Sequence, residues 1–126
     1  MTFVDTNVFM YAVGGPHPLR AKARAWLFRA VERNDRLVTS AEVLQELLHA
    51  YLPVARHATL DAALTLALGC VHDVWPLEAE DVHLARALEV DHPGLSARDL
   101  VHIACCRRRN VGSIKTYDRA LIAAMS

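Results

Sequence analysis

The hydrophobic positions of this chain form short apolar runs that alternate with longer stretches of helical periodicity. Four short runs, each ending at a turn or cap residue, are typical of β-strands. In seven other stretches the apolar residues recur three and four positions apart, which is the spacing of one helix face. The predicted strands are 2–5, 37–39, 71–75 and 113–116, and the predicted helices are 6–13, 19–34, 40–53, 59–68, 78–90, 97–108 and 118–125.

This alternation of strands and helices predicts the α/β fold class. Strands that are joined through helices form a mainly parallel sheet, and the connections between them are right-handed. At 126 residues the chain has the length of one domain and can bury a substantial core. We therefore expect a single α/β domain that spans residues 1–126.

Two of the predicted helices carry informative patterns. Helix 59–68 is apolar almost all round, which is typical of a helix buried in the core or covered by a partner. We expect it to belong mainly to the core. In helix 78–90, the residues Val82, Ala85, Leu88 and Glu89 mark the register of the helix.

The composition narrows the class of protein without naming a ligand. Hydrophobic residues make up 53% of the chain, which argues against disorder. Basic and acidic residues are equal at 14 each, so a nucleic-acid partner would need a local basic patch. No signal-peptide pattern and no uncharged apolar run of roughly 18 residues is present. Three cysteines without the spacing of a disulfide framework fit a reducing compartment, so we expect a cytoplasmic protein.

Four acidic residues lie at or near the junctions between predicted strands and helices. Asp5 ends the first predicted strand, and Asp118 follows the fourth. Glu46 lies in the first turns of the helix after the second strand, and Asp99 lies in the first turn of helix 97–108. Because the carboxyl ends of parallel strands share one edge of a sheet, these four side chains are expected to converge there.

Each of these carboxylates also has a local explanation. Asp5 and Asp118 have the position of helix N-caps, which stabilise a helix by about 1 kcal/mol each. Ser96 and Asp99 resemble a capping box with aspartate in place of glutamate. Glu46 has a competitor in Glu42, one helical turn earlier. The functional interpretation therefore depends on the four side chains acting together.

Together, four carboxylates in one cleft require a cation. Two carboxylates about 4 Å apart repel by roughly 4 kcal/mol at an effective dielectric constant of 20, so such a group is protonated or binds metal. An all-oxygen site favours Mg²⁺ or Mn²⁺, and such an ion can activate water and stabilise charge on a phosphoryl group. The polar neighbours that could hold the carboxylates or the substrate are Thr6, Asn7 and Thr116.

Four motifs then give a resemblance that covers nearly the whole chain. They are VDTNV at 4–8, SAEVLQEL at 40–47, ARDLVHIA at 97–104 and KTYDR at 115–119. In this order and at this spacing they resemble the PIN domain, and most closely the VapC-type toxins of toxin–antitoxin pairs. The resemblance implies a three-layer α/β/α fold, a homodimer, Mg²⁺- or Mn²⁺-dependent cleavage of RNA, and a cognate antitoxin that blocks the site.

The resemblance also assigns roles to residues. Asp5, Glu46, Asp99 and Asp118 take the positions of the family's acidic quartet. Asp5 and Asp99 would be direct metal ligands, and Glu46 and Asp118 would bind directly or through water. Members of the family often continue into a fifth, edge strand after the last acidic motif, whereas eight residues follow Asp118 here. We expect four strands and leave a fifth open.

Several arginines are candidates for contacts with RNA phosphates. They are Arg98, Arg119 and the run Arg107, Arg108 and Arg109. Basic residues at the end of a helix also stabilise the helix dipole, which is a competing explanation for the run.

Other functions remain open at this point. A PIN-like RNA-binding or regulatory module without catalytic activity would keep the fold and lack the reaction. Two carboxylate–histidine pairs at i, i+3 spacing, Glu46 with His49 and Asp99 with His102, suggest a di-iron helix bundle. Such bundles contain no sheet, so the predicted strands argue against this function. A dehalogenase-like phosphatase would want a second aspartate where Asn7 stands. We expect His102 to pack near the acidic site and His49 to lie at the margin of the core.

Overall fold

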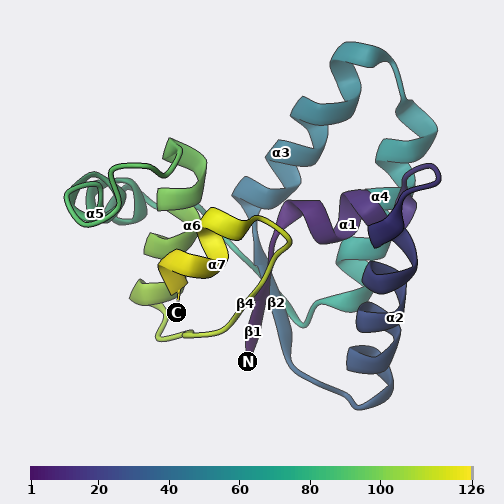
Figure 1. Ribbon diagram of the computed structural model, residues 1–126, viewed down its shortest axis with the longest axis horizontal. Coiled ribbons are helices and arrows are strands. Elements are labelled where there is room, and N and C mark those ends of the chain that lie inside the picture. The colour runs from purple at the N-terminus through teal and green to yellow at the C-terminus, as the bar shows by residue number, and fades with distance from the viewer. Residues whose placement is uncertain (126) are drawn as a thin grey trace.

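The computed structural model describes residues 1–125, and in it strands and helices alternate along the chain (Figure 1). The strands are β1 (Thr2–Val4), β2 (Leu37–Ser40), β3 (Asp73–Trp75) and β4 (Ile114–Lys115). The helices are α1 (Thr6–Val13), α2 (Pro18–Glu32), α3 (Ala41–Tyr51), α4 (His57–Cys70), α5 (Ala79–Leu88), α6 (Ala97–Arg108) and α7 (Arg119–Met125), with a short 3₁₀ helix η1 (Leu52–Val54) after α3.

The four strands form one parallel sheet in the order β3-β2-β1-β4. From β1 the chain moves outward to β2 and β3, and then crosses back to β4 on the other side of β1. Right-handed connections in opposite directions put their helices on opposite faces of a sheet. Accordingly α1, α2 and α4 lie on one side of the strands, and α5, α6 and α7 lie on the other (Figure 1).

This arrangement confirms the predicted three-layer α/β/α sandwich. Within residues 1–125 the sheet has four strands, all parallel, and no fifth strand joins it. The larger part of the core lies between the sheet and helices α1 to α4, with Phe3 and Val4 of β1 fully buried. A smaller apolar cluster joins α5, α6 and α7, around Ile103 and Leu121. In the part of the chain that the structure describes, no helix is both long and apolar enough to cross a membrane.

The inward face of α5 differs from the one that the hydrophobic pattern predicts. Val82 is 50% exposed, whereas Asp81 is fully buried. Asp81 turns inward because it accepts a hydrogen bond from the backbone of Glu78 at 2.8 Å and thereby caps the helix. Arg108 and Arg109 of α6 neutralise the buried carboxylate at 2.7 and 2.9 Å. An ion pair between helices therefore sets the rotation of α5.

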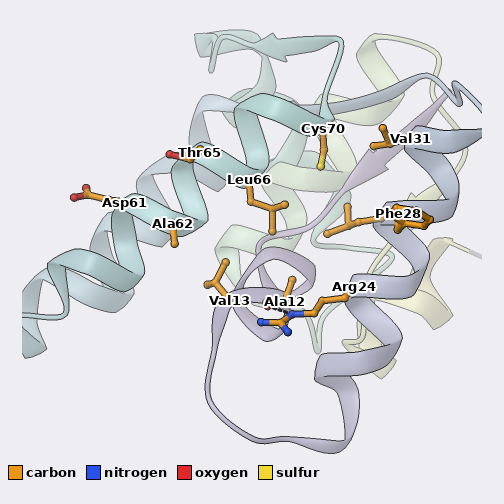
Figure 2. A pocket seen from close by; sticks show the side chains of 11 residues that line it. Ala12, Val13, Arg24, Phe28, Val31, Asp61, Ala62, Thr65, Leu66 and Cys70 are labelled. Atoms are coloured by element: carbon orange, nitrogen blue, oxygen red, sulfur yellow. Dashed lines mark hydrogen bonds between the residues drawn. The ribbon is translucent and has the colours of Figure 1, made fainter.

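The helix α4 divides its apolar residues between the core and the surface. Leu60, Ala63 and Ala67 are buried, as expected for a core helix, but Leu68 is 57% exposed. On another side of α4, Leu66 faces α2 across an apolar groove of about 800 Å³ (Figure 2). We call this the α2–α4 groove, and its wall on α2 includes Leu27, Phe28 and Val31.

Candidate metal centre

The candidate site lies at the carboxyl end of β1, between its neighbours β2 and β4. The chain leaves β1 toward one side for β2 and returns on the other side for β4, so this is the switch point of the sheet, where open α/β sheets bind ligands. Asp5 stands there, 5% exposed, directly after β1. It also caps α1, because its Oδ1 accepts a hydrogen bond from Thr6 N at 2.7 Å.

The polar neighbours of Asp5 hold its second oxygen in place. Thr116 Oγ1 donates a hydrogen bond to Asp5 Oδ2 at 2.7 Å, and Asn7 Nδ2 approaches the same oxygen at 3.4 Å. Asn7 also donates to Thr116 at 3.0 Å and accepts from Tyr117 N at 3.1 Å. Three segments of the chain, around β1, α1 and β4, thus fix the orientation of this one carboxylate.

Glu46 reaches the same place from α3. Thr6 Oγ1 donates a hydrogen bond to its Oε2, so Thr6 binds one carboxylate through its backbone and another through its side chain. Glu42, one turn earlier on α3, is not among the residues that line the cavity at this edge. Of the two glutamates, the structure therefore places Glu46 beside Asp5.

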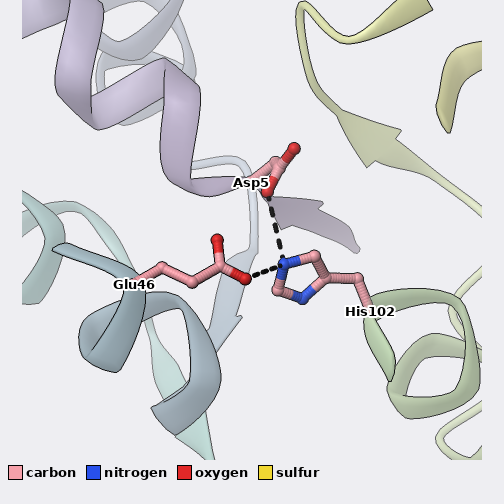
Figure 3. Close-up of side chains that lie close together, drawn as sticks. All are labelled: Asp5, Glu46 and His102. Atoms are coloured by element: carbon pink, nitrogen blue, oxygen red, sulfur yellow. Dashed lines mark ion pairs between the residues drawn. The ribbon is translucent and has the colours of Figure 1, made fainter. Parts of the chain in front are cut away.

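His102 of α6 completes the group, and it lies deeper than the sequence indicated. Its Nε2 is 2.8 Å from Glu46 Oε1 and 3.5 Å from Asp5 Oδ1, and the side chain is 1% exposed (Figure 3). One atom from each of the three residues lies within 4.8 Å of the other two. The signal that could have placed His102 here is its i, i+3 spacing from Asp99, because residues three apart share one face of a helix.

The four predicted carboxylates line one cavity of about 420 Å³. Its walls include Asp5, Glu46, Asp99 and Asp118, which the sequence separates by up to 113 positions. Asp118 keeps its capping role as well, since its Oδ1 accepts from Ala120 N at 2.9 Å and starts α7. Asp99 N donates to Ser96 Oγ at 3.2 Å, which is the cap expected at the start of α6. Capping and convergence are therefore compatible.

The charges around the cavity perturb one another. Burial raises the pKa of Asp5, and the negative charge of Glu46 raises it further. The contacts with His102, Thr116 and Thr6 lower it, but by less. Burial and then the charge of Asp118 raise the pKa of Asp99. The raised pKa values mean that the ionised forms of Asp5 and Asp99 are less stable in the folded protein than in the unfolded chain. A bound cation would stabilise these ionised forms.

The contact between Glu46 and His102 shifts both groups toward their charged forms. Burial alone would raise the pKa of Glu46, but the contact with His102 and the hydrogen bond from Thr6 lower it overall. Burial alone would lower the pKa of His102, but Glu46 and then Asp5 raise it overall. The imidazole thus offsets part of the negative charge of the site.

The donor atoms fit a divalent cation. Asp5, Glu46 and His102 each offer one ligand atom, and these atoms lie within 4.8 Å of one another. Glu46 Oε1 and His102 Nε2 lie 2.8 Å apart and pair with each other. Carboxylate oxygens suit Mg²⁺ and Mn²⁺, and imidazole nitrogen suits first-row transition metals.

The predicted phosphate contacts separate into two groups. Arg98 lines the cavity, and Arg119 is exposed beside Asp118. Arg108 and Arg109 form ion pairs with the buried Asp81, so a phosphate contact by these two remains a prediction that competes with these pairs. Arg107 is exposed at the end of α6 and is not part of the cavity wall. His49, expected at the margin of the core, is exposed and lines the mouth of the cavity.

Comparison with known proteins places this geometry in a family. The chain is similar to Ribonuclease VapC23 of Mycobacterium tuberculosis, with 60% identity over 124 residues that cover 98% of both proteins. Two solved structures share the fold. VapC20 of Mycobacterium tuberculosis, described as a toxin that cleaves the sarcin–ricin loop, has a TM-score of 0.80 at 22% identity and covers 98% of this chain and 95% of its own.

The second solved structure is VapBC2 of Rickettsia felis bound to a DNA fragment of its promoter. Its TM-score is 0.68 at 16% identity, over 93% of this chain and 86% of that chain. At these identities both structures support the fold alone. The PIN domain family matches residues 2–125. With that match and the 60% identical relative, the chain belongs to the PIN-domain family, in its VapC branch.

Proposed function

We propose that this protein is a metal-dependent endoribonuclease and acts as the toxin of a toxin–antitoxin pair. The observation that carries the proposal is the convergence of Asp5, Glu46, Asp99 and Asp118 on one cavity. The curated relative at 60% identity is named a ribonuclease. A reducing cytoplasm, where RNA and free cysteines coexist, is the expected location.

In this proposal the four carboxylates hold Mg²⁺ or Mn²⁺, directly or through water. The ion would lower the pKa of a bound water and neutralise charge on the phosphate. Thr116 and the backbone of Thr6 orient Asp5 for this task, and the Thr6 hydroxyl orients Glu46. Burial and the charge of Asp118 raise the pKa of Asp99, so this carboxylate would accept a proton more readily than an ordinary aspartate.

The RNA backbone would approach over the open side of the cavity. Arg98 stands in the cavity wall and Arg119 next to Asp118, so both can neutralise phosphates of the substrate. Because the net charge of the chain is zero, these local charges rather than a bulk field would hold RNA. Their removal should weaken binding and reduce its dependence on salt.

The partners in this proposal are a cognate antitoxin and a second copy of the chain. The α2–α4 groove is the surface that we assign to the antitoxin, because its walls are mainly apolar and Phe28 is left 65% exposed (Figure 2). An amphipathic helix laid into such a groove buries its apolar face against the receptor. The similar fold of VapBC2, which was solved together with its promoter DNA, is in line with an antitoxin that also binds DNA.

A ribonuclease assay with the purified chain tests the catalytic part. Cleavage of RNA should require Mg²⁺ or Mn²⁺, stop when EDTA is added, and be absent in Asp5→Asn. Cleavage that persists in EDTA or in this variant would refute a metal-dependent site at Asp5. A folded protein that binds RNA without cleaving it under either metal would favour the alternative, a PIN-like module without catalytic activity.

A further inference from the structure

Three aromatic rings that contact one another lie next to the residues of the acidic cavity. The rings of Tyr11 and His17 have centroids 4.6 Å apart and planes inclined by 31°. Tyr117 meets Tyr11 edge-on, with a centroid distance of 5.7 Å. Both distances are typical of direct aromatic contacts. We call Tyr11, His17 and Tyr117 the aromatic cluster.

Both tyrosines are close neighbours of residues that form the acidic site. Tyr117 stands between Thr116 and Asp118, and its backbone N–H donates a hydrogen bond to Asn7 Oδ1 at 3.1 Å. Tyr11 follows Asn7, which lines the cavity, by four residues on α1. The two therefore share one face of the helix, about one turn apart. A nucleotide that reached the cluster would lie close in sequence to the phosphate in the cavity.

His17 is the outermost of the three rings. It is exposed, whereas Tyr11 and Tyr117 are partly buried and pack against the core. Its Nδ1 accepts a hydrogen bond from Leu19 N at 3.0 Å, which caps α2 and fixes the orientation of the imidazole. The cap requires only an acceptor atom, which serine or asparagine would supply without a ring. Capping therefore does not account for an exposed imidazole that stacks on Tyr11.

A lysine supplies positive charge beside the cluster. Lys115 Nζ lies 4.8 Å from the ring centroid of Tyr117 and 5.5 Å from that of Trp26, within the range of cation–π contacts. Among residues 1–125, no carboxylate forms an ion pair with this ammonium group. Its charge is therefore available to a phosphate of a bound nucleic acid.

We propose that the aromatic cluster is a platform on which unpaired bases of the RNA substrate stack, with Lys115 as a phosphate contact beside it. This rests on the proposed ribonuclease function and names the form of RNA that the site accepts. Bases of a single strand or a loop can be splayed onto aromatic rings, whereas bases of a duplex are already paired and stacked. Because every base has a π-face, the platform selects unpaired nucleotides with little preference for sequence.

Binding of a short fluorescent RNA of mixed sequence to the full chain, in EDTA to prevent cleavage, tests the platform. The unmodified chain should bind the free strand more tightly than the same strand paired with its complement. His17→Asn keeps a capping oxygen and removes the ring, so it should weaken binding of the free strand about tenfold. His17→Phe keeps a ring and removes the cap, so it should retain RNA affinity and lower the melting temperature. The matched control is His83→Asn, whose histidine is exposed on α5 across the sheet from α1 and α2, and it should bind RNA normally (Figure 1).

Cleavage of the free strand in Mn²⁺ gives a second readout. His17→Asn should raise KM about tenfold and leave kcat nearly unchanged, because a base on the platform contacts no reacting atom. Lys115→Gln should reduce the dependence of binding on salt.

Three results would overturn the platform and leave metal-dependent cleavage intact. They are equal affinities of the unmodified chain for free and paired RNA, unchanged RNA affinity in His17→Asn, and an equal loss in His17→Asn and His17→Phe, which would assign the effect to the cap. A folded chain that neither binds nor cleaves the RNA would overturn the platform and the proposed function together.

Discussion

The hydroxyl of Thr116 donates a hydrogen bond to Oδ2 of Asp5 at 2.7 Å, across 111 positions of sequence. The two residues meet because β4 pairs in parallel with β1 and Lys115 lies opposite Val4, so that the residues that follow them also lie side by side. The other oxygen of Asp5 accepts from Thr6 N. The sheet and the first turn of α1 together fix the carboxylate before any ion binds.

Replacing Thr116 by valine should therefore weaken cation binding while the fold survives. A group that orients a metal ligand typically changes metal affinity by about 10- to 100-fold, whereas loss of one buried hydrogen bond costs about 1 kcal/mol of stability. Thr39→Val is the matched control, because Thr39 is also buried and donates to a backbone oxygen, Val4 O at 3.0 Å, and not to a carboxylate. Mn²⁺ titration and thermal unfolding should separate the two variants. Equal cation affinities would contradict an orienting role.

Asp99→Asn should abolish RNA cleavage and stabilise the metal-free fold. Burial and the charge of Asp118 raise the pKa of Asp99, so its ionised form is less stable in the folded protein than in the unfolded chain. Removing that charge should raise the melting temperature in EDTA by a few degrees, while activity falls by about 100-fold or more. The exposed Asp73 of β3 provides a control, since Asp73→Asn should change neither quantity. An active Asp99→Asn variant would remove this residue from the site.

The carboxylates could be predicted because their positions follow from topology alone. Each stands at or near the end of a parallel strand or the start of a helix, and parallel strands bring these ends to one edge. His102 could be placed only on the same helix face as Asp99. Whether that face meets Asp5 and Glu46 depends on how α6 tilts against β1, which is a property of packing that one sequence does not express.

The rotation of α5 has the same origin. The apolar pattern includes Val82, which the structure leaves 50% exposed, because the buried Asp81 turns toward α6 and pairs with Arg108 and Arg109. The sequence shows the arginine run on α6, and it does not show that Asp81, 27 and 28 residues away, already binds two of these arginines.

The pair of Asp81 with Arg108 and Arg109 should make stability depend on pH in the acidic range. Burial alone would raise the pKa of Asp81, but the hydrogen bonds from Arg109, the Glu78 backbone and Arg108 lower it to about 2. A carboxylate whose pKa is lower in the folded state stabilises the protein above its unfolded pKa, which is 3.8, and loses this contribution as the pH falls toward 2. By linkage the contribution at neutral pH is about 2 kcal/mol.

Denaturant unfolding of Asp81→Asn should show that loss at pH 7 and a much smaller difference from the unmodified chain near pH 2. Asp35→Asn is the control, because Asp35 and Arg33 form an ion pair at 3.0 Å that is largely exposed to solvent. Such surface pairs contribute about 0–1 kcal/mol, so the control should lose little at either pH. A destabilisation of Asp81→Asn that stayed constant across this range would mean that its packing, and not its charge, is responsible.

The α2–α4 groove should be separable from the catalytic site by substitution. Phe28 is 65% exposed on the groove wall, so Phe28→Ser should leave folding and RNA cleavage unchanged. Apolar anchors of an interface typically cost 1–2 kcal/mol or more when truncated, so binding of the cognate antitoxin should weaken by about tenfold. Val90→Ser is the control, because Val90 is 75% exposed beyond the end of α5 and does not line the groove. Titration calorimetry with the antitoxin should rank the two variants, and equal affinities would exclude the groove as the antitoxin surface.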